Sequence, residues 1–251
     1  MANCYTDGTY LAKNPTWHSE DAGWKLSHIL RALQQAHVTD FHHILDAGCG
    51  SGAIIKAWAA QAAQVQFTGW DISPQALALA VQNVPQNVQF ASGNMPPAGP
   101  FDIALAIDVI EHIPSHKTWL DAVAMRAPVL VLHVPLDLSV RSFLFPQLLE
   151  RERESVGHIH FFTARSLKKF LEEQHYEILS AHYTNKYVER PPQLTRLKSR
   201  IGMFIRQAAH RLLSRAWTAF FIGGYSLMLT VKTTQAYSGS CSTYRAFKSK
   251  R

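Results

Sequence analysis

One short segment near the start of the chain constrains its fold more than any other. In residues 42–52 a short apolar run leads into an acidic residue and three alternating glycines, and a helix-forming run follows. Glycine has no Cβ atom and tolerates unusual backbone angles, so a strand–turn–helix of this kind lets the backbone approach a ligand closely. The segment therefore predicts the first strand and helix of an α/β sheet, joined by a turn that suits a nucleotide-like ligand.

A second acidic residue follows at the spacing that such a turn requires. Residues 65–70 form another predicted buried strand, and Asp71 stands at its end, nineteen residues after Gly52. A carboxylate in this place can accept hydrogen bonds from both hydroxyls of a ribose. The two segments together predict that the chain binds an adenosine-containing cofactor.

Strand-forming and helix-forming runs alternate as far as residue 183. The near-continuous apolar run at 101–107 is typical of a strand buried in a parallel sheet. This rhythm predicts a doubly wound α/β fold with helices on both faces of a mostly parallel sheet. Strands are expected at 43–46, 65–70, 88–91, 101–107, 129–134, 176–183 and, antiparallel, 225–231, and helices at 19–35, 52–64, 115–125, 163–174 and after Ser73-Pro74.

Charge is distributed unevenly along the 251 residues, although the net charge is only +7. Residues 186–251 carry thirteen Lys and Arg against one acid, Glu189. The first 185 residues hold twelve bases and seventeen acids, a net charge of −5. The basic part could therefore face phosphate, an anionic membrane or nucleic acid.

Within this basic part, residues 194–215 alternate basic and apolar residues at helical spacing. Three interpretations remain open: a helix packed on the domain with a solvated basic face, a helix docked on an anionic membrane or a lipid-linked substrate, and a nucleic-acid contact. Nucleic acid is the least favoured because no aromatic-studded RNA-binding motif accompanies the charge.

Cysteine usage and hydropathy favour the cytoplasm. The three cysteines, Cys4, Cys49 and Cys241, include no CxxC pair, which predicts free thiols in a reducing compartment. The N-terminus lacks the pattern of a secretory signal, and no apolar run reaches the roughly 18–20 residues of a spanning helix. We expect a cytoplasmic protein with, at most, peripheral membrane contact through residues 194–215.

Four motifs in order resemble those of class I S-adenosylmethionine-dependent methyltransferases. They are Asp46-Ala-Gly-Cys-Gly-Ser-Gly52, Asp71, Phe101-Asp102 and Asp108-Val-Ile-Glu-His-Ile-Pro114. A further segment, Gly157-His-Ile-His-Phe-Phe-Thr163, is similar to one in the branch that includes ubiquinone-pathway-like and bacterial glycan-cluster methyltransferases. The resemblance covers roughly residues 5–185.

The resemblance implies a Rossmann-like methyltransferase fold with a seven-stranded, mostly parallel sheet, and S-adenosylmethionine as cofactor. Asn94 departs from the family pattern, which usually has Asp there, but its amide oxygen can also accept a bond from the adenine amino group. The implied cofactor-binding residues are Gly48, Gly50 and Gly52 at the turn, Asp46 toward the methionine ammonium, Asp71 at the ribose, Ile72, Asn94 and Met95 at the adenine, and Asp108 at the methionine end.

Three of these assignments have an alternative interpretation: the glycine turn, Asp71 and Asp108. The run Gly48-x-Gly50-x-x-Ala53 also fits the dinucleotide pattern GxGxxA, so a dehydrogenase must be considered. Asp46 argues against it, because a carboxylate there would repel a pyrophosphate. For Asp71 and Asp108 the alternative is an N-terminal cap of the following helix.

His112 and His158 are the candidate catalytic residues. An imidazole can remove the proton of an acceptor hydroxyl near neutral pH, or it can simply position the acceptor, because alignment contributes much of the rate of methyl transfer. His158-x-His160 also resembles half of a metal site. No clear acidic partner accompanies it and strand geometry would separate the two side chains, so no metal is predicted.

The expected organisation has four parts. Residues 1–40 form an N-terminal lid and helix, in which Trp17 and His18 either cover the cofactor or anchor the segment. Residues 41–185 form the core, with an insertion at 136–160, and are followed by a basic helix and terminal hairpin at 186–233 and a flexible tail at 234–251.

The predicted activity is methyl transfer to a hydroxyl of a small metabolite, a saccharide or a lipid-linked intermediate. An RNA-directed methyltransferase and a non-catalytic, cofactor-binding partner subunit are the alternatives. The choice of acceptor rests on family analogy.

Overall fold

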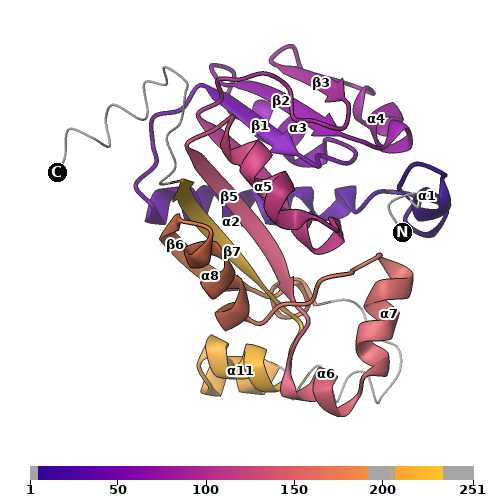
Figure 1. Ribbon diagram of the computed structural model, residues 1–251, viewed down its shortest axis with the longest axis vertical. Coiled ribbons are helices and arrows are strands. Elements are labelled where there is room, and N and C mark those ends of the chain that lie inside the picture. Colours follow the sequence, from indigo (N-terminus) through magenta and orange to yellow (C-terminus); the bar gives the residue numbers. More distant parts are fainter. Residues whose placement is uncertain (1–4, 192–203, 205–206, 234–251) are drawn as a thin grey trace.

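A single seven-stranded sheet organises the computed structural model, which describes residues 5–191, 204 and 207–233 (Figure 1). The strands lie in the order β3-β2-β1-β4-β5-β7-β6. They are β1 (His43–Ala47), β2 (Gln66–Asp71), β3 (Val88–Ser92), β4 (Ile103–Ile107), β5 (Val129–Leu136), β6 (Tyr176–Thr184) and β7 (Tyr225–Thr233).

Strands β1 to β5 are parallel, and β7 inserts antiparallel between β5 and β6. Every residue of β4 is buried, as expected for a strand that helices cover on both faces. The chain leaves β1 toward β2 on one side and reaches β4 on the other, so the strand order reverses between β1 and β4. Such a reversal opens a crevice at the carboxyl ends of the two strands, which is where ligands of doubly wound folds bind.

Helices pack on both faces of the sheet and divide the core in two. Leu45 and Ala104 face α5 and α8, whereas the alternate residues Ile44 and Ile103 face α2 and α3. The helices are α1 (Thr9–Lys13), α2 (Ala22–Gln35), α3 (Ala53–Ala59), α4 (Pro74–Ala80), α5 (His116–Ala124), α6 (Val140–Leu144), α7 (Gln147–Ser155), α8 (Ala164–Glu173), α9 (Lys186–Glu189) and α11 (Arg215–Phe221), with the 3₁₀ turns η2 (Ser19–Asp21) and η3 (Ile110–His112).

The predicted doubly wound, mostly parallel sheet is confirmed, including the antiparallel strand near the C-terminus. Two predicted helices differ in extent. The helix expected at 52–64 ends at Ala59, because residues 60–65 form the tight turn that returns the chain to β2. The helix expected at 19–35 begins as the 3₁₀ turn η2 before α2.

The C-terminal predictions fall only in part on described residues. Most of the basic stretch 194–215 lies outside them, although residues 207–212 are helical, and the tail 234–251 lies wholly outside. Among the described residues, no helix is both long and apolar enough to cross a membrane.

The capping box at the start of α8 yields a test of the fold. The Thr163 side chain accepts a hydrogen bond from the Ser166 N–H, and the Ser166 hydroxyl bonds back to Thr163. We expect Thr163→Ala to lower the free energy of unfolding by about 1 kcal/mol, measured by urea denaturation. Thr163→Ser keeps the hydroxyl and serves as the control, so an equal loss in both variants would contradict the capping role.

Candidate active site

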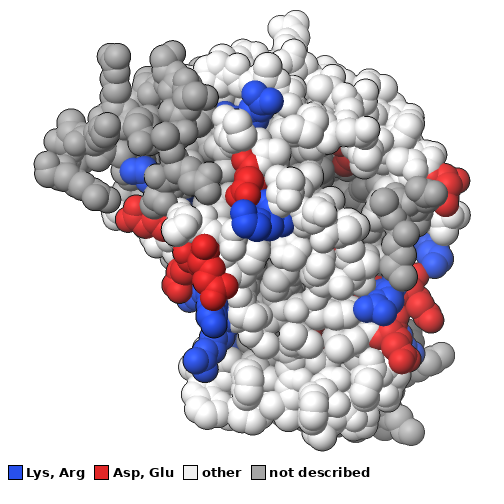
Figure 2. Space-filling model, in the orientation of Figure 1, with Lys and Arg blue, Asp and Glu red and all other residues white. Residues whose placement is uncertain are grey.

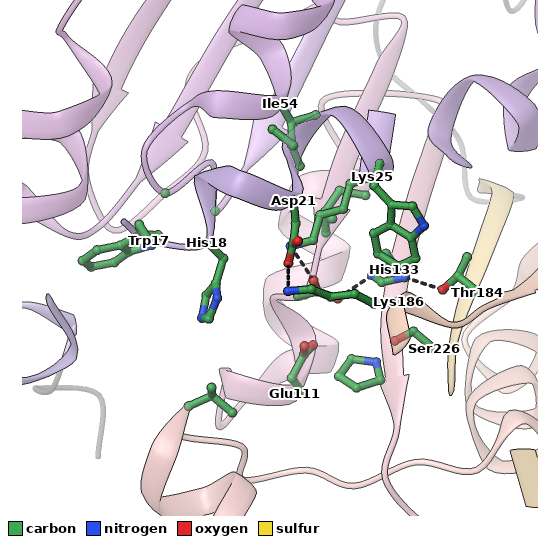
Figure 3. Close-up of a pocket in the computed structure, with 18 of the residues that line it drawn as sticks. Trp17, His18, Asp21, Lys25, Ile54, Glu111, His133, Thr184, Lys186 and Ser226 are labelled. Carbon is green, nitrogen blue, oxygen red and sulfur yellow. Dashed lines mark hydrogen bonds and ion pairs between the residues drawn. The ribbon is translucent and has the colours of Figure 1, made fainter. Parts of the chain in front are cut away.

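A cavity of about 340 Å³ lies at the carboxyl ends of β1, β4 and β5. Its size falls near the lower end of small-molecule sites, which measure roughly 300–1,000 Å³. The turn after β1, the start of α2, the turn after β4 and the segment before α8 all contribute to its wall. Figure 3 shows side chains of distant segments around the same space, among them His18, Lys25 and Glu111.

The glycine turn after β1 forms one wall of the cavity, and its glycines serve different purposes. Gly50 has φ +54°, and a Cβ atom there would lie 2.5 Å from Cδ1 of Trp17. Gly48 lines the cavity beside it. A Cβ atom on Gly52 would instead lie 2.5 Å from the ring of Phe90, so this glycine packs against β3 and does not line the cavity.

Asp46 lies at the end of β1 as a buried acid. It is only 2% exposed, and its Oδ2 has no hydrogen-bond partner within the described part of the chain. Burial, together with the nearby charge of Asp71, raises the pKa of Asp46 to about 7. A buried carboxylate oxygen without a partner, on the wall of a cavity, suits a ligand that brings a positive charge.

Asp71 holds the glycine turn against β2. Its carboxylate accepts hydrogen bonds from the N–H groups of Gly50 and Ser73, each at 2.8 Å. The cap of α4 is Ser73, whose side chain accepts from the Ala76 N–H, so the alternative role for Asp71 is excluded. Burial raises the pKa of Asp71, and the two backbone bonds oppose this rise.

The predicted adenine residues lie outside the cavity wall, at the open rim beyond β2 and β3. Ile72 is 51% exposed and Met95 63% exposed, and Asn94 is exposed beside it. Ile72 and Met95 are therefore large apolar side chains open to solvent, which a flat aromatic ligand could cover.

Asp108 takes part in a partly buried ionic network. It has φ +56°, and its carboxylate contacts Lys25 Nζ at 2.8 Å and also His133 Nδ1. The Nε2 of His133 bonds the Thr184 hydroxyl at 2.8 Å (Figure 3). Burial alone would raise the pKa of Asp108, but the charges of His133 and Lys25 lower it well below its usual range. Asp108 therefore does not cap a helix.

His112 and His158 lie side by side on the cavity wall, with ring centroids 4.9 Å apart. The Nδ1 of His112 contacts the Gly157 carbonyl oxygen at 3.2 Å and the Tyr5 hydroxyl at 2.8 Å. The Nδ1 of His158 contacts Asp137 Oδ2 at 2.8 Å. Burial and the neighbouring His158 lower the pKa of His112 to about 4, so its imidazole is neutral at pH 7.

His160 points away from this pair, as strand-like geometry predicts. Its Nε2 donates to the Ile113 carbonyl at 3.0 Å, and its ring packs against that of His116.

Several polar cavity residues were not identified from the sequence, among them Glu111, Lys25, His133 and Asp137. Glu111 stands inside the recognised segment 108–114, where its place between apolar residues was the available signal. Lys25, His133 and Asp137 carry no such signal, because each belongs to a different part of the chain.

The N-terminal segment covers part of the site. Trp17 packs over Gly50, and its ring centroid lies 4.7 Å from that of Tyr10. Lys186 Nζ of α9 bonds Asp21 at the entrance to α2 (Figure 3). Trp17 and His18 thus lie at the cavity, next to the glycine turn.

A family model described as a methyltransferase domain matches residues 21–181, which is more than half of the chain. The chain belongs to this methyltransferase family. No curated protein matches its sequence.

Solved structures share the fold of this methyltransferase. A candidate methyltransferase from Bacillus halodurans has a TM-score of 0.55 and 20% identity, over 82% of this chain and 98% of its own. Magnesium protoporphyrin IX methyltransferase from Synechocystis, with bound SAH, has a TM-score of 0.53 and 14% identity. The match covers 86% of this chain and 84% of that protein's chain. An S-adenosylmethionine-dependent methyltransferase from Geobacter sulfurreducens, in complex with S-adenosylhomocysteine, has a TM-score of 0.53 and 13% identity. The match covers 82% of this chain and 90% of that protein's chain.

The predicted class I S-adenosylmethionine-dependent methyltransferase is thereby confirmed in family, fold and enzyme class. At 13–20% identity these structures establish a shared fold and no substrate. The narrower branch and the roles of individual residues stay predictions.

The buried charge of Asp46 makes the stability of the unliganded methyltransferase sensitive to pH. Its pKa is about 7 in the folded chain and near 3.8 when exposed, so between these values the folded state holds a proton that the unfolded state releases. Stability from this group is therefore lost as pH rises toward 7. We expect Asp46→Asn to stabilise the unliganded chain at pH 8 by on the order of 2 kcal/mol, and by less at pH 5.

Chemical denaturation of both proteins at the two pH values measures this difference. Asp40→Asn, at an exposed acid shortly before β1, is the matched control and should change little at either pH. An equal effect of Asp46→Asn at pH 5 and pH 8 would show that the carboxylate is not buried in its charged form.

Proposed function

We propose that this chain transfers the methyl group of S-adenosylmethionine to a hydroxyl of a small or lipid-linked acceptor, with the cofactor across the carboxyl ends of β1 and β2. The observation that carries the proposal is the Asp46 carboxylate, buried and without a partner for its Oδ2 among the described residues. The ammonium of the methionine part is the group on this cofactor that would satisfy it.

The other cofactor contacts follow from the same turn. Asp71 would accept the ribose hydroxyls with the lone pairs that its bonds to Gly50 and Ser73 leave free, since a carboxylate accepts about four hydrogen bonds. The exposed Ile72 and Met95 would cover the faces of the adenine, and the Asn94 amide would meet its amino group. Trp17, packed over Gly50, would serve as the lid that closes this region.

When bound, the sulfonium supplies an already activated methyl group, so the protein's task is to align the acceptor oxygen and release its proton. His112 and His158 lie on the cavity wall where an acceptor would enter. The pKa of His112 is about 4, so its imidazole is neutral at pH 7 and is a weak base there. We infer that His112 positions the acceptor rather than acting as a general base, with the His158 ring beside it on the same wall.

An exposed apolar surface supports a lipid-linked acceptor. Its residues flank the end of β5 and the start of β7, where Tyr225 also lines the cavity. Clusters of exposed large apolar side chains mark interaction sites more often than chance exposure does. The members are Phe143 and Leu144 on α6, Phe145 just after it, and Leu212, Leu213, Trp217, Phe220 and Phe221 on or before α11.

An RNA acceptor finds less support in the described residues. Figure 2 shows the charges of one face in small clusters of both signs, over α7 and α8, rather than in a continuous basic field. Phosphate backbones are held by arrays of Lys and Arg of one sign. A non-catalytic partner subunit would bind the cofactor without turnover, so activity with any acceptor excludes it.

Calorimetry with S-adenosylmethionine and S-adenosylhomocysteine tests the cofactor site. We expect micromolar-range binding to the wild type, and at least a tenfold loss in Asp46→Asn because the ammonium loses its partner. The affinity of the wild type should rise about tenfold between pH 5.5 and 7, as Asp46 ionises while the ammonium stays protonated. Asp40→Asn is the control.

Binding that is equal in Asp46→Asn and Asp40→Asn would remove the observation on which the proposal rests. No binding of either molecule to well-folded wild type would exclude the enzyme as proposed.

Vesicle sedimentation tests the apolar surface. We expect the wild type to sediment with vesicles of anionic phospholipid, and the double variant Phe143→Ser, Trp217→Ser to lose most of this binding, since both side chains are more than half exposed. Val81→Ser, at an equally exposed apolar residue beyond α4, is the control. Equal sedimentation of all three proteins would assign membrane contact to another part of the chain and argue for a water-soluble acceptor.

A further inference from the structure

Three metal-ligating side chains converge on the cavity wall beside the proposed cofactor region. One donor atom from each of Glu111, His112 and His158 lies within 4.8 Å of the other two. We propose that these three residues bind a divalent transition-metal ion, which would hold the acceptor oxygen. The binding of the ion does not depend on the proposed function, whereas its contact with the acceptor oxygen rests on that function.

Glu111 is the residue that most strongly indicates a cation-binding site. Its side chain is 0% exposed, and neither carboxylate oxygen has a hydrogen-bond partner among the described residues. Figure 3 shows this carboxylate pointing into the cavity with no interaction drawn to it. A buried carboxylate without a partner is strongly destabilising, so such groups are normally paired or coordinate a metal.

Both imidazoles are held as metal-binding histidines usually are. His158 is oriented through its Nδ1 by Asp137, and His112 through its Nδ1 by the Gly157 carbonyl. In each ring Nε2 is therefore the nitrogen left to bind an ion, and that of His112 lies 3.9 Å from Glu111 Oε1. A carboxylate or carbonyl behind the ligating imidazole is the arrangement that sets its tautomer and raises its basicity.

The backbone brings the two halves of the site together. The Glu111 carbonyl accepts bonds from the N–H groups of Ile159 and His160, at 2.9 and 3.0 Å. Gly157, at φ +85°, turns the chain just before His158, and a Cβ atom there would lie 2.8 Å from the Tyr5 hydroxyl. The site is therefore built by the fold rather than by a chance meeting of flexible side chains.

Two imidazoles and one carboxylate suit an ion of intermediate softness such as Zn²⁺ or Co²⁺. Bonds of about 2.1 Å in a tetrahedral arrangement place donor atoms about 3.4 Å apart. The present donors would therefore move closer by an ångström or so on binding. Three protein ligands leave at least one position for a water or an acceptor oxygen, whose hydroxyl pKa the ion would lower.

We do not infer a metal site at a neighbouring group of possible ligands, which consists of His18, Glu20 and Asp21. Glu20 Oε2 already accepts from the Thr16 hydroxyl, and Asp21 is bonded to Lys186. These carboxylates have partners, whereas that of Glu111 has none in the described part of the chain.

Titration of the full chain with Co²⁺, after removal of bound metal by chelation, tests the site. We expect one equivalent to bind, with a visible absorption band from the ligated ion. Glu111→Gln and His158→Ala should each weaken binding at least tenfold. Asp137→Asn should weaken it about tenfold, because the His158 ring loses its orientation.

His160→Ala removes the next histidine of the same segment, and His18→Ala disables the neighbouring group; both should bind Co²⁺ as the wild type does. Glu111→Gln is nearly isosteric and leaves an uncharged polar group in the buried site, so it should fold. S-adenosylhomocysteine binding, measured on every variant, reports the cofactor region separately.

Co²⁺ binding that is absent from the wild type, or unchanged in Glu111→Gln and His158→Ala, would overturn the metal site whatever the cofactor result. Binding lost in His18→Ala alone would move the ion to the neighbouring group and equally contradict the proposal. Co²⁺ binding without S-adenosylhomocysteine binding would instead keep the metal site and refute the proposed function.

Discussion

The turn that follows β1 is the constraint on which the rest of the site depends. It leaves the sheet where the strand order reverses, and the bond from the Gly50 N–H to Asp71 joins it to the end of β2. A side chain at Gly50 would collide with Trp17, so the glycine allows the N-terminal segment to lie over the turn. The cavity wall, the buried Asp46 and the position of the lid all follow from this one backbone path.

Charge in this cavity is compensated unequally. Asp108 has a partner within the protein for each carboxylate oxygen, Lys25 Nζ for Oδ2 and His133 Nδ1 for Oδ1. Asp46 and Glu111 retain carboxylate oxygens without partners among the described residues, although both side chains are buried. Folding alone does not favour such groups. We infer that the carboxylate of Asp108 stabilises the fold, whereas those of Asp46 and Glu111 would be paired by bound ligands.

Periodicity and turn chemistry predicted most of the fold, because they act over a few neighbouring residues. The helices expected after Ser73-Pro74 and from Thr163 are present, with Ser73 and Thr163 as their N-caps. The end of α3 was missed, since the apolar pattern continues through the turn at 60–65. The proposed cofactor residues could be predicted from the sequence for the same reason, because Asp46, Gly50 and Asp71 belong to short motifs with fixed spacing.

By itself, therefore, the sequence determined the class of fold, the family and the segments that surround the proposed cofactor region. Only the tertiary structure decided what meets those segments. His112 and the Gly157 turn stand forty-five residues apart, yet backbone bonds to the Glu111 carbonyl bring them into contact. Lys25, on α2, contacts Asp108 after β4, although the two residues are far apart in the sequence. Local patterns record neighbours along the chain, whereas burial and partnership depend on strand pairing across the whole sheet, so the metal-ligating cluster became visible only once the chain was folded.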